Sequence, residues 1–384
     1  MDARHQSDEL TARVRRALAD AEIARDVLFT GLADLDALAV RVREQTAQVT
    51  VTLPIPSAMV RDAIARDVTH VAQDVDGVST VECRFESEVP SFEDRVDFIP
   101  EVKNVVAVAS GKGGVGKSTV AVNVASALAA AGATVGLLDA DIYGPNAPTM
   151  LGLEERTPDA TLDDQIVPRE AHGVRVMSMD FIVEEDDPVI WRGPLVDEFI
   201  KQLFSDVEWG DLDYLFVDLP PGTGDAQLSL VQHLPVTGAV IVTTPEPVAV
   251  DDARRGLQGF ARYGVPVLGI AENMASFECP DCESEHDIFD AGGGERLAAE
   301  FDIPVLGKLP VDPAVGTLDP DTDEGTPGVS IPGIGRLQLP RMREERERSS
   351  TLPPIAVRDG GGDSRAAMER LATRTAARIN SLAV

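Results

Sequence analysis

Residues 109–119 read ASGKGGVGKST, and they continue directly from the apolar run VVAVAS at 105–110. Within them, residues 111–118 fit G-x-x-x-x-G-K-[ST], the pattern of a phosphate-binding loop. The glycines of such a loop let backbone N–H groups turn toward a phosphate, its lysine reaches the β- and γ-phosphate oxygens, and its hydroxyl holds Mg²⁺. An apolar strand before the loop and an Ala/Val-rich helix after it supply the context that the motif requires. The sequence therefore predicts a nucleotide site in which Lys117 and Ser118 take the last two roles.

Two acidic motifs accompany this loop. Asp218 ends the apolar run DYLFVD, where a Walker-B aspartate helps to hold Mg²⁺, and Asp139 and Asp141 end the run TVGLLDAD. Any one of them could instead cap a helix or form a turn, but parallel strands bring their carboxyl ends to one edge of a sheet. Beside the loop, Asp218 is expected to bind Mg²⁺ with Ser118, and Asp141 to place the attacking water. The residues expected to bind the nucleotide's phosphates are Gly111, Lys112, Gly113, Gly114, Val115, Gly116, Lys117, Ser118 and Thr119.

Beyond the loop, the chain alternates uninterrupted apolar runs with helical patterns. Such runs are typical of parallel strands, because helices cover both faces of a parallel sheet. The expected strands lie at 105–110, 134–141, 213–220, 238–245, 265–273 and 303–310. The predicted fold class is therefore α/β, with a parallel-sheet P-loop NTPase domain covered by helices and a small α/β domain before it.

Two changes of pattern divide the chain. Before the first, the run TAQVTVTL places Val49, Val51 and Leu53 on one face of a strand, a helix is expected over 57–75, and a second strand is expected over 77–85. After the second, prolines, glycines and charges predict a flexible segment. The predicted divisions are a small α/β domain over 1–89, a linker over 90–104, the ATPase domain over 105–323, a flexible insertion over 324–363 and a C-terminal helix over 364–384 that docks on the ATPase domain.

The net charge of −31 comes from 65 acidic against 34 basic residues, and the acids are spread along the whole chain. This charge disfavours nucleic acid as a partner, because phosphate binding needs clustered cations. It favours a halophilic source, since a salty cytoplasm screens self-repulsion. No segment is typical of a signal peptide, and no stretch approaches the ~20 apolar residues of a membrane span. A cytoplasmic protein without a membrane or nucleic-acid partner is therefore predicted.

The chain has only five lysines, and two of them lie in the loop. Lys117 is the one that the motif requires, so Lys112 needs a separate explanation, of which a solvated loop lysine is the simplest. The stretch KGGVGKST at 112–119 resembles the deviant Walker A loop of the family that includes the nitrogenase iron protein and the Min-type and Par-type ATPases. This resemblance implies a homodimer in which Lys112 reaches the partner subunit's phosphates and supplies the charge that an arginine finger supplies elsewhere. Lys112, Lys117, Asp141 and Asp218 are then the expected catalytic residues.

Two of the three cysteines, Cys279 and Cys282, form the motif CPDC. Two thiolates supply half of the four ligands that a tetrahedral metal or a cluster takes, so two subunits together would complete the set. Cys83 lies in the small domain and is expected to be a buried apolar residue. Structural zinc, an iron–sulfur cluster and a dithiol redox pair all remain open on ligand count. The redox alternative is disfavoured because nearby carboxylates should raise the pKa of the thiols, namely those of Glu278, Asp281, Glu283 and Glu285.

The chain also resembles the Mrp-type iron–sulfur cluster carrier ATPases over most of residues 105–315. The shared stretches are SGKGGVGKST, LLDADIYGPN, WRGP at 191–194, DLDYLFVDLPPGTGD, VTTPEPVAVDD, GIAENMASFECPDC, IFDAGGGERLA and GKLPVDP. The resemblance implies a [4Fe–4S] cluster bridged by Cys279 and Cys282 of both subunits and passed to apo iron–sulfur proteins under the control of ATP. It also places Asn273 against the adenine base.

Residues 20–88 resemble the small iron–sulfur-assembly domain that often precedes such ATPases. That domain commonly has a cysteine where this chain reads LPIPSAMVRD, so a thiol relay through it is not expected. Two other functions stay open. A Min- or Par-like positioning ATPase would bind a membrane or DNA, although the C-terminal segment has arginines and no aromatic residue for a membrane. An ATPase whose cysteine pair binds structural zinc is the other alternative.

Overall fold

The structure is a computed structural model of the whole chain. It describes residues 3–32, 37–91, 99, 101–141, 144–153, 157–161, 165–181, 203–204, 206–223, 227, 230–232, 234–279, 282, 284–289, 291–312, 315, 328–331, 335–338, 352–360 and 362–382. The WRGP stretch lies outside these residues. In the described part of the chain, no helix has the length and apolar character needed to cross a membrane.

The larger domain is built on an eight-stranded sheet with the order β15-β12-β11-β4-β10-β5-β9-β8. Its strands are β4 (Val105–Ser110), β5 (Val135–Asp139), β8 (Arg169–Ala171), β9 (Val174–Ser178), β10 (Tyr214–Asp218), β11 (Gly238–Thr243), β12 (Val267–Glu272) and β15 (Val305–Lys308). All neighbouring pairs are parallel except β8 with β9. The predicted α/β class is confirmed, and the β8–β9 pair at the sheet edge is an addition that we did not predict.

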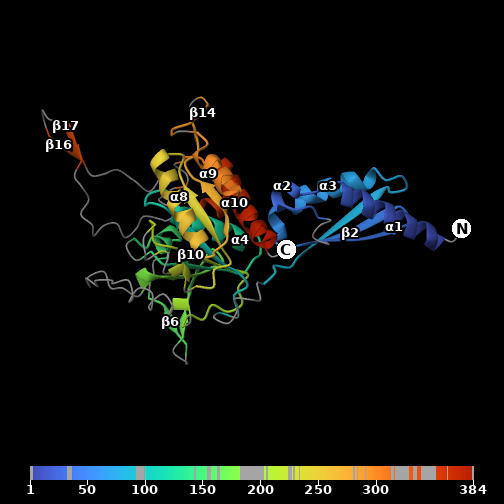
Figure 1. Ribbon diagram of the computed structural model, residues 1–384, viewed down its shortest axis with the longest axis horizontal. Coiled ribbons are helices and arrows are strands. Elements are labelled where there is room, and N and C mark those ends of the chain that lie inside the picture. Colours follow the sequence, from blue (N-terminus) through green and yellow to red (C-terminus); the bar gives the residue numbers. More distant parts are fainter. Residues whose placement is uncertain are drawn as a thin grey trace.

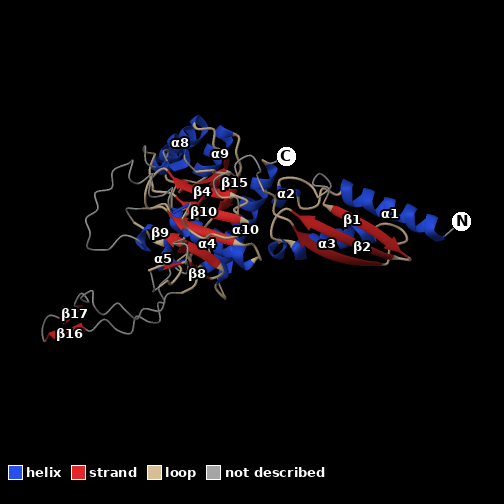
Figure 2. Ribbon diagram, turned by 90° about the horizontal axis from the view of Figure 1, so that it is seen from below, coloured by secondary structure: helices blue, strands red, loops and turns tan. Residues whose placement is uncertain are grey.

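Helices cover both faces of this sheet (Figure 2), which is why every residue of β4, β5, β10 and β11 is buried. Helices α8 and α9 pack on one face, while α4 and α10 pack on the other. The helices of this domain are α4 (Lys117–Ala130), α5 (Ala147–Met150), α8 (Pro247–Arg262), α9 (Gly293–Phe301) and α10 (Gly362–Ser381). Because the central strands all run the same way, their carboxyl ends and the loops that follow them meet at one edge.

The small domain, blue in Figure 1, has a three-stranded sheet with the order β1-β2-β3. Its elements are α1 (Ala3–Asp20), α2 (Arg25–Leu28), β1 (Leu38–Arg43), β2 (Thr46–Leu53), α3 (Arg61–Gln73) and β3 (Thr80–Ser87). Val49, Val51 and Leu53 are buried, so the face predicted for this strand is confirmed. β2 and β3 are parallel, and α3 is the crossover between them. The antiparallel partner β1 was missed.

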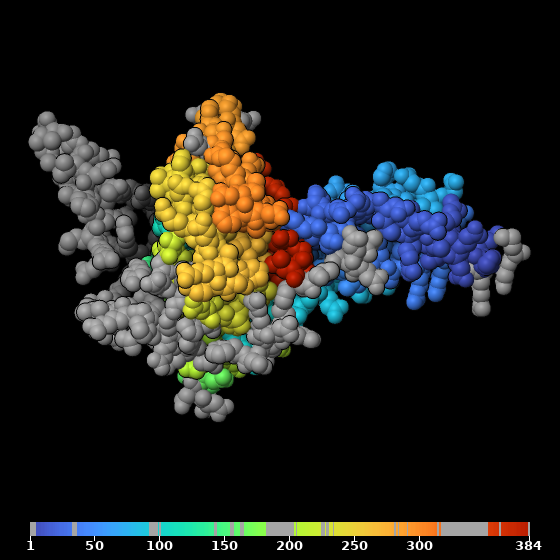
Figure 3. All heavy atoms as spheres, in the orientation of Figure 1, coloured from blue at the N-terminus to red at the C-terminus, as the bar shows by residue number. Residues whose placement is uncertain are grey.

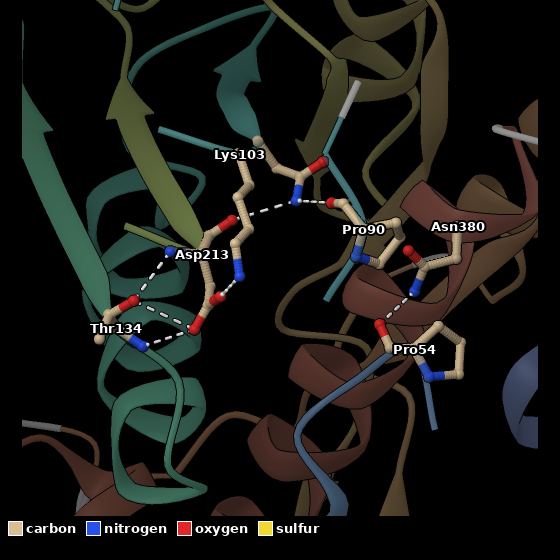
Figure 4. A network of polar contacts seen from close by, with 7 residues as sticks. Pro54, Pro90, Lys103, Thr134, Asp213 and Asn380 are labelled. Carbon is tan, nitrogen blue, oxygen red and sulfur yellow. Dashed lines mark hydrogen bonds and ion pairs between the residues drawn. The ribbon is translucent and has the colours of Figure 1, made fainter. Parts of the chain in front are cut away.

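The C-terminal helix α10 connects the two domains. It packs along α4 and β15, and its last turns contact the small domain. Asn380 Nδ2 donates to the carbonyl of Pro54 at 2.7 Å, and the Arg374 guanidinium lies 4.4 Å from the ring centre of Phe29 (Figure 4 shows the first of these). Such a cation–π contact and a short hydrogen bond hold the small domain against the end of the helix.

The entry of the chain into the large domain is fixed by a polar network (Figure 4). Lys103 Nζ lies 2.7 Å from Asp213 Oδ1, and the other carboxylate oxygen of Asp213 accepts the backbone N–H of Thr134 at 2.9 Å. Asn104 Nδ2 donates to the carbonyls of both Pro90 and Asp213. These contacts hold the linker against the start of β5 and of β10. Both strands start at the edge of the sheet opposite the phosphate loop.

The segment predicted to be a flexible insertion, 324–363, is ordered at its end. Ile355 is buried, and the backbone N–H of Ala356 donates to Asn123 Oδ1 of α4 at 3.0 Å. The prediction was wrong for residues 352–360, because Pro and Gly composition does not reveal apolar residues that a distant helix covers. Earlier in the segment, β16 (Gly328–Ile331) pairs with β17 (Gly335–Gln338), and most of the rest lies outside the described residues.

Candidate functional site

The phosphate loop lies at the carboxyl end of β4 and leads directly into α4. Gly114 and Gly116 have φ angles of +81° and +85°, which residues with a Cβ rarely adopt. At Gly111 a Cβ would lie 2.3 Å from the carbonyl carbon of Asp252 in α8, so no side chain fits there. A Cβ at Gly113 would meet nothing within 4 Å. The turn is therefore open at Gly113 and Gly114, where its backbone is free to approach an anion.

Lys117 is the centre of a buried ionic cluster. Its Nζ lies 2.6 Å from Asp218 Oδ1, 3.8 Å from Asp141 Oδ2 and 3.3 Å from Ser118 Oγ. Lys117 is 5% exposed and Asp218 is fully buried. Burial raises the pKa of Asp218, while the charge of Lys117 and the hydroxyl of Ser118 oppose this shift. The structure thus brings together Lys117, Ser118, Asp141 and Asp218.

One oxygen of this cluster has an unused bonding capacity. Asp218 Oδ2 is buried and makes no hydrogen bond to any described residue. A buried carboxylate oxygen without a partner is costly, and it is the kind of ligand that Mg²⁺ prefers. The hydroxyl of Ser118 supplies a second hard oxygen beside it. The donor set therefore fits a magnesium ion.

The sequence predicted that Asp139 projects into the crevice at the carboxyl edge of the sheet. In the structure, its carboxylate instead accepts hydrogen bonds from two backbone N–H groups. Its Oδ1 accepts the N–H of Asp141 at 3.1 Å, and its Oδ2 accepts the N–H of Ala147, the first residue of α5, at 3.0 Å. Burial and the nearby charge of Asp218 raise the pKa of Asp139 to about 7, although these hydrogen bonds and Lys117 oppose the shift. Asp139 holds the loop that presents Asp141.

The raised pKa of Asp139 makes a testable contribution to stability. The folded protein keeps this proton up to pH about 7, whereas the unfolded chain releases it near its ordinary value of 3.8. Between these values the folded state binds more protons, so the free energy of unfolding falls as pH rises, by an amount on the order of 4 kcal/mol. Chemical denaturation of the wild type and Asp139→Asn, from pH 4.5 to 8 at constant KCl, should give a flatter profile for the variant. Parallel profiles would contradict the assignment.

Lys112 makes its ion pair outside the Lys117 cluster. Its Nζ lies 2.5 Å from Oε2 of Glu246, the residue that precedes α8, and both side chains are partly exposed. Within one subunit, Lys112 is therefore held by an ion pair and does not join Lys117 and Asp218. Glu246 was not among the predicted site residues. Its position in the short loop after the buried strand β11, at the same sheet edge as Asp218, is the signal that could have identified it.

Asn273, the residue after β12, lies against the phosphate loop. Its Nδ2 donates to the carbonyl of Val115 at 2.9 Å, and its backbone N–H donates to Thr243. Beside it is a small cavity of about 150 Å³ that opens next to the loop. Its lining includes Gly116, Thr119, Asn273, Met274, Pro310 and Met368. Met368 belongs to α10, so the C-terminal helix forms one wall of this cavity beside the phosphate loop, which the sequence did not reveal.

The two cysteines occupy the end of a short hairpin formed by β13 (Phe277–Glu278) and β14 (Glu285–His286). The hairpin projects from the large domain (Figures 1 and 3). The N–H of Cys279 donates to the carbonyl of Ser284 at 3.0 Å; Cys279 is half-buried and Cys282 is exposed. Among the described residues, no three His, Cys, Asp or Glu side chains are grouped to hold a metal ion. One subunit thus presents two thiols, half of a tetrahedral ligand set.

The pKa prediction for these thiols was wrong at Cys282. Hydrogen bonds from the hydroxyl and the backbone of Ser284, and from Cys279, lower the pKa of Cys282. The turn brings these donors close, which outweighs the acidic sequence context. Of the four acidic neighbours, Asp281 and Glu283 lie outside the described residues. Cys83, in β3, is half-buried against the core of the small domain, and burial raises the pKa of its thiol.

Comparison of this sequence and structure with known proteins identifies a matching family and similar proteins. Residues 101–332 match the ParA family described as NUBPL iron-transfer P-loop NTPase. An iron–sulfur cluster carrier protein of Synechocystis sp. is 46% identical over 321 residues, which are 82% of this chain and 86% of the relative. One of Escherichia coli is 49% identical over 59% of this chain and 61% of the relative. Among solved structures, an ADP complex of a nucleotide-binding protein from Archaeoglobus fulgidus has a TM-score of 0.52 and 37% identity, over 58% of this chain and 87% of that chain.

Proposed function

Because the chain belongs to the ParA/NUBPL family of iron-transfer P-loop NTPases, we propose that it is an ATP-hydrolysing carrier that delivers iron–sulfur clusters to apo-proteins. The observation that carries this proposal is the pair Cys279 and Cys282, presented on a projecting hairpin. The hairpin follows β12, so it leaves the sheet at the same edge as the phosphate loop. Nucleotide and cargo would thus be handled on one side of the molecule.

The buried cluster supplies the ATPase chemistry. On this proposal, Lys117 leaves Asp218 to bind the β- and γ-phosphates, and the backbone of 111–116 cradles them. Ser118 and Asp218 would hold Mg²⁺, which would supply positive charge beside the phosphate oxygens. Asp141, kept in place by Asp139, positions the attacking water, and Asn273 contacts the adenine.

The remaining catalytic charge would come from a second subunit. Lys112 is partly exposed and bound only to Glu246 among the described residues, so exchanging that partner for a phosphate costs little. We place Lys112 on the partner's nucleotide in a homodimer, where it stabilises the transition state as an arginine finger does. The same dimer would bring two cysteine pairs together.

Four thiolates from two subunits match the ligand count of a [4Fe–4S] cluster. On this proposal the cluster is cargo: it bridges Cys279 and Cys282 of both subunits and passes to apo iron–sulfur proteins. The exposure of Cys282 supports transfer, because a recipient's thiols must reach the iron. The high negative charge supports a protein without a nucleic-acid partner, and we propose that it acts in the cytoplasm without a membrane partner.

A transfer assay tests this function. The protein, loaded with iron and sulfide without oxygen, is mixed with an apo-dehydratase that needs a [4Fe–4S] cluster, in the presence of an iron chelator. We expect the wild type and Cys83→Ala to restore dehydratase activity, and Cys279→Ser/Cys282→Ser to restore none above the level of free iron and sulfide. Equal restoration by the double variant would refute the assignment of the cargo site.

A further inference from the structure

A seven-residue segment, Asn273–Cys279, runs from the nucleotide pocket to the cargo thiols. Its first residue is bound to the phosphate loop through the Asn273 amide and Val115. Its last residue is the first thiol of the hairpin. Any displacement of Asn273 by a nucleotide therefore lies one short segment away from Cys279.

Met274, the second residue of this segment, has a left-handed backbone with a φ of +56°. A residue with a Cβ is disfavoured there by a factor of about five to thirty, whereas glycine enters the region freely. Such a conformation persists only where the surroundings impose it, and it is found at ligand clamps and switches. Met274 also lines the nucleotide pocket.

Hydrogen bonds on both sides impose this conformation. Before Met274, the backbone N–H of Asn273 is bound to Thr243 of β11 at 2.8 Å, and its amide is bound to the loop. After it, Ala275 donates to the carbonyl of Leu309 at 2.9 Å, and Ser276 accepts the N–H of Val311 at 2.7 Å. With both flanks fixed, Met274 is the residue that takes the strained torsion.

The segment also separates two hollows. On one side is the nucleotide pocket, lined by Asn273 and Met274; on the other is a groove of about 490 Å³ lined by Ala275, Ser276 and residues of the hairpin, including Glu278. Pro310 borders both. The wall between the two hollows is thus formed by this segment together with Pro310.

We propose that Met274 is a strained hinge through which nucleotide binding loosens the hairpin that carries Cys279 and Cys282. This inference rests on the proposed function and assigns it a means of control. A nucleotide that engages the Asn273 amide weakens its bond to Val115, so the N-terminal flank is held only by the backbone bond to Thr243, and Met274 returns to an ordinary backbone conformation. The hairpin then moves and its half-buried thiol becomes accessible.

The test measures the alkylation rate of the hairpin thiols by a maleimide in cluster-free, reduced, full-length protein carrying Cys83→Ala. Saturating ADP is used because it lacks the γ-phosphate that Lys112 would contact, so the effect within one subunit is isolated. We expect ADP to accelerate alkylation about five-fold or more. Met274→Gly should react slowly with or without ADP, because glycine is unstrained in the left-handed conformation and nothing drives the hairpin out of its closed position. Met274→Ala should keep the ADP response, because alanine has a Cβ and therefore retains the backbone strain.

Three outcomes would overturn the hinge: no ADP effect in the parent protein, an undiminished ADP response in Met274→Gly, or its loss in Met274→Ala, which would assign the effect to the side chain. These results are independent of cargo. A protein that binds no cluster would refute the carrier function and leave the thiol rates as they are, while a failed hinge would leave cluster binding untouched.

Discussion

Lys117→Ala is expected to lower ATP hydrolysis about 10³-fold and also to destabilise the nucleotide-free protein by about 3 kcal/mol. The first effect follows from loss of the charge that binds the transferring phosphoryl group. The second follows from burial: Asp218 is fully buried and its one direct cation, 2.6 Å away, is removed. Steady-state phosphate release and chemical denaturation measure the two effects separately.

The matched control for Lys117→Ala is the double variant Lys117→Ala/Asp218→Asn. Removing the unpaired carboxylate charge should recover most of the lost stability, while hydrolysis stays abolished because both phosphate and Mg²⁺ ligands are gone. If Lys117→Ala were as stable as the wild type, the buried pair would not contribute as described. If it still hydrolysed ATP, the loop would not be the catalytic site.

Lys112→Ala should lose hydrolysis by about 10²- to 10³-fold with almost no change in stability. Its charge is needed only in the transition state, and its pair with Glu246 is partly exposed, so breaking it costs less than about 1 kcal/mol. This contrast with Lys117→Ala separates a charge acting between subunits from one that also supports the fold. Glu246→Gln, which frees Lys112 without removing it, is the matched control and should retain hydrolysis.

Mixing variants shows whether Lys112 acts on the partner's nucleotide. Lys112→Ala and Asp141→Asn are each expected to be inactive alone. Combined in equal amounts, they should recover about a quarter of wild-type activity, because about half of randomly paired dimers are mixed and each mixed dimer has one complete site. No recovery, or full activity of Lys112→Ala alone, would show that the lysine does not act across an interface.

The parts of the site that the sequence predicted are those built from local rules. A glycine-rich turn between a buried strand and a helix fixes Lys117 and Ser118, and the ends of parallel strands place Asp141 and Asp218 beside them. The strands of the large sheet were predicted from apolar runs. In the small domain, the alternation of buried Val40 and Val42 with exposed residues indicates strand β1, which we did not predict.

The remaining parts depend on contacts between distant segments. Nothing near Met368 in the sequence indicates that it lines the cavity beside the phosphate loop, because the packing of α10 against α4 brings it there. Asp139 and Asp141 have the same sequence context, yet one binds backbone and the other faces Lys117. The thiol pKa of Cys282 depends on a turn geometry that overrides its acidic neighbours.

The content of iron, acid-labile sulfide and zinc in protein purified without oxygen tests the central claim most directly. Wild-type protein and Cys279→Ala/Cys282→Ala would be compared in high KCl, with the dimer fraction measured on the same samples. We predict about four irons and four sulfides per dimer, absent from the double variant. One zinc per dimer without sulfide would contradict the account and make the hairpin cysteines a structural clasp.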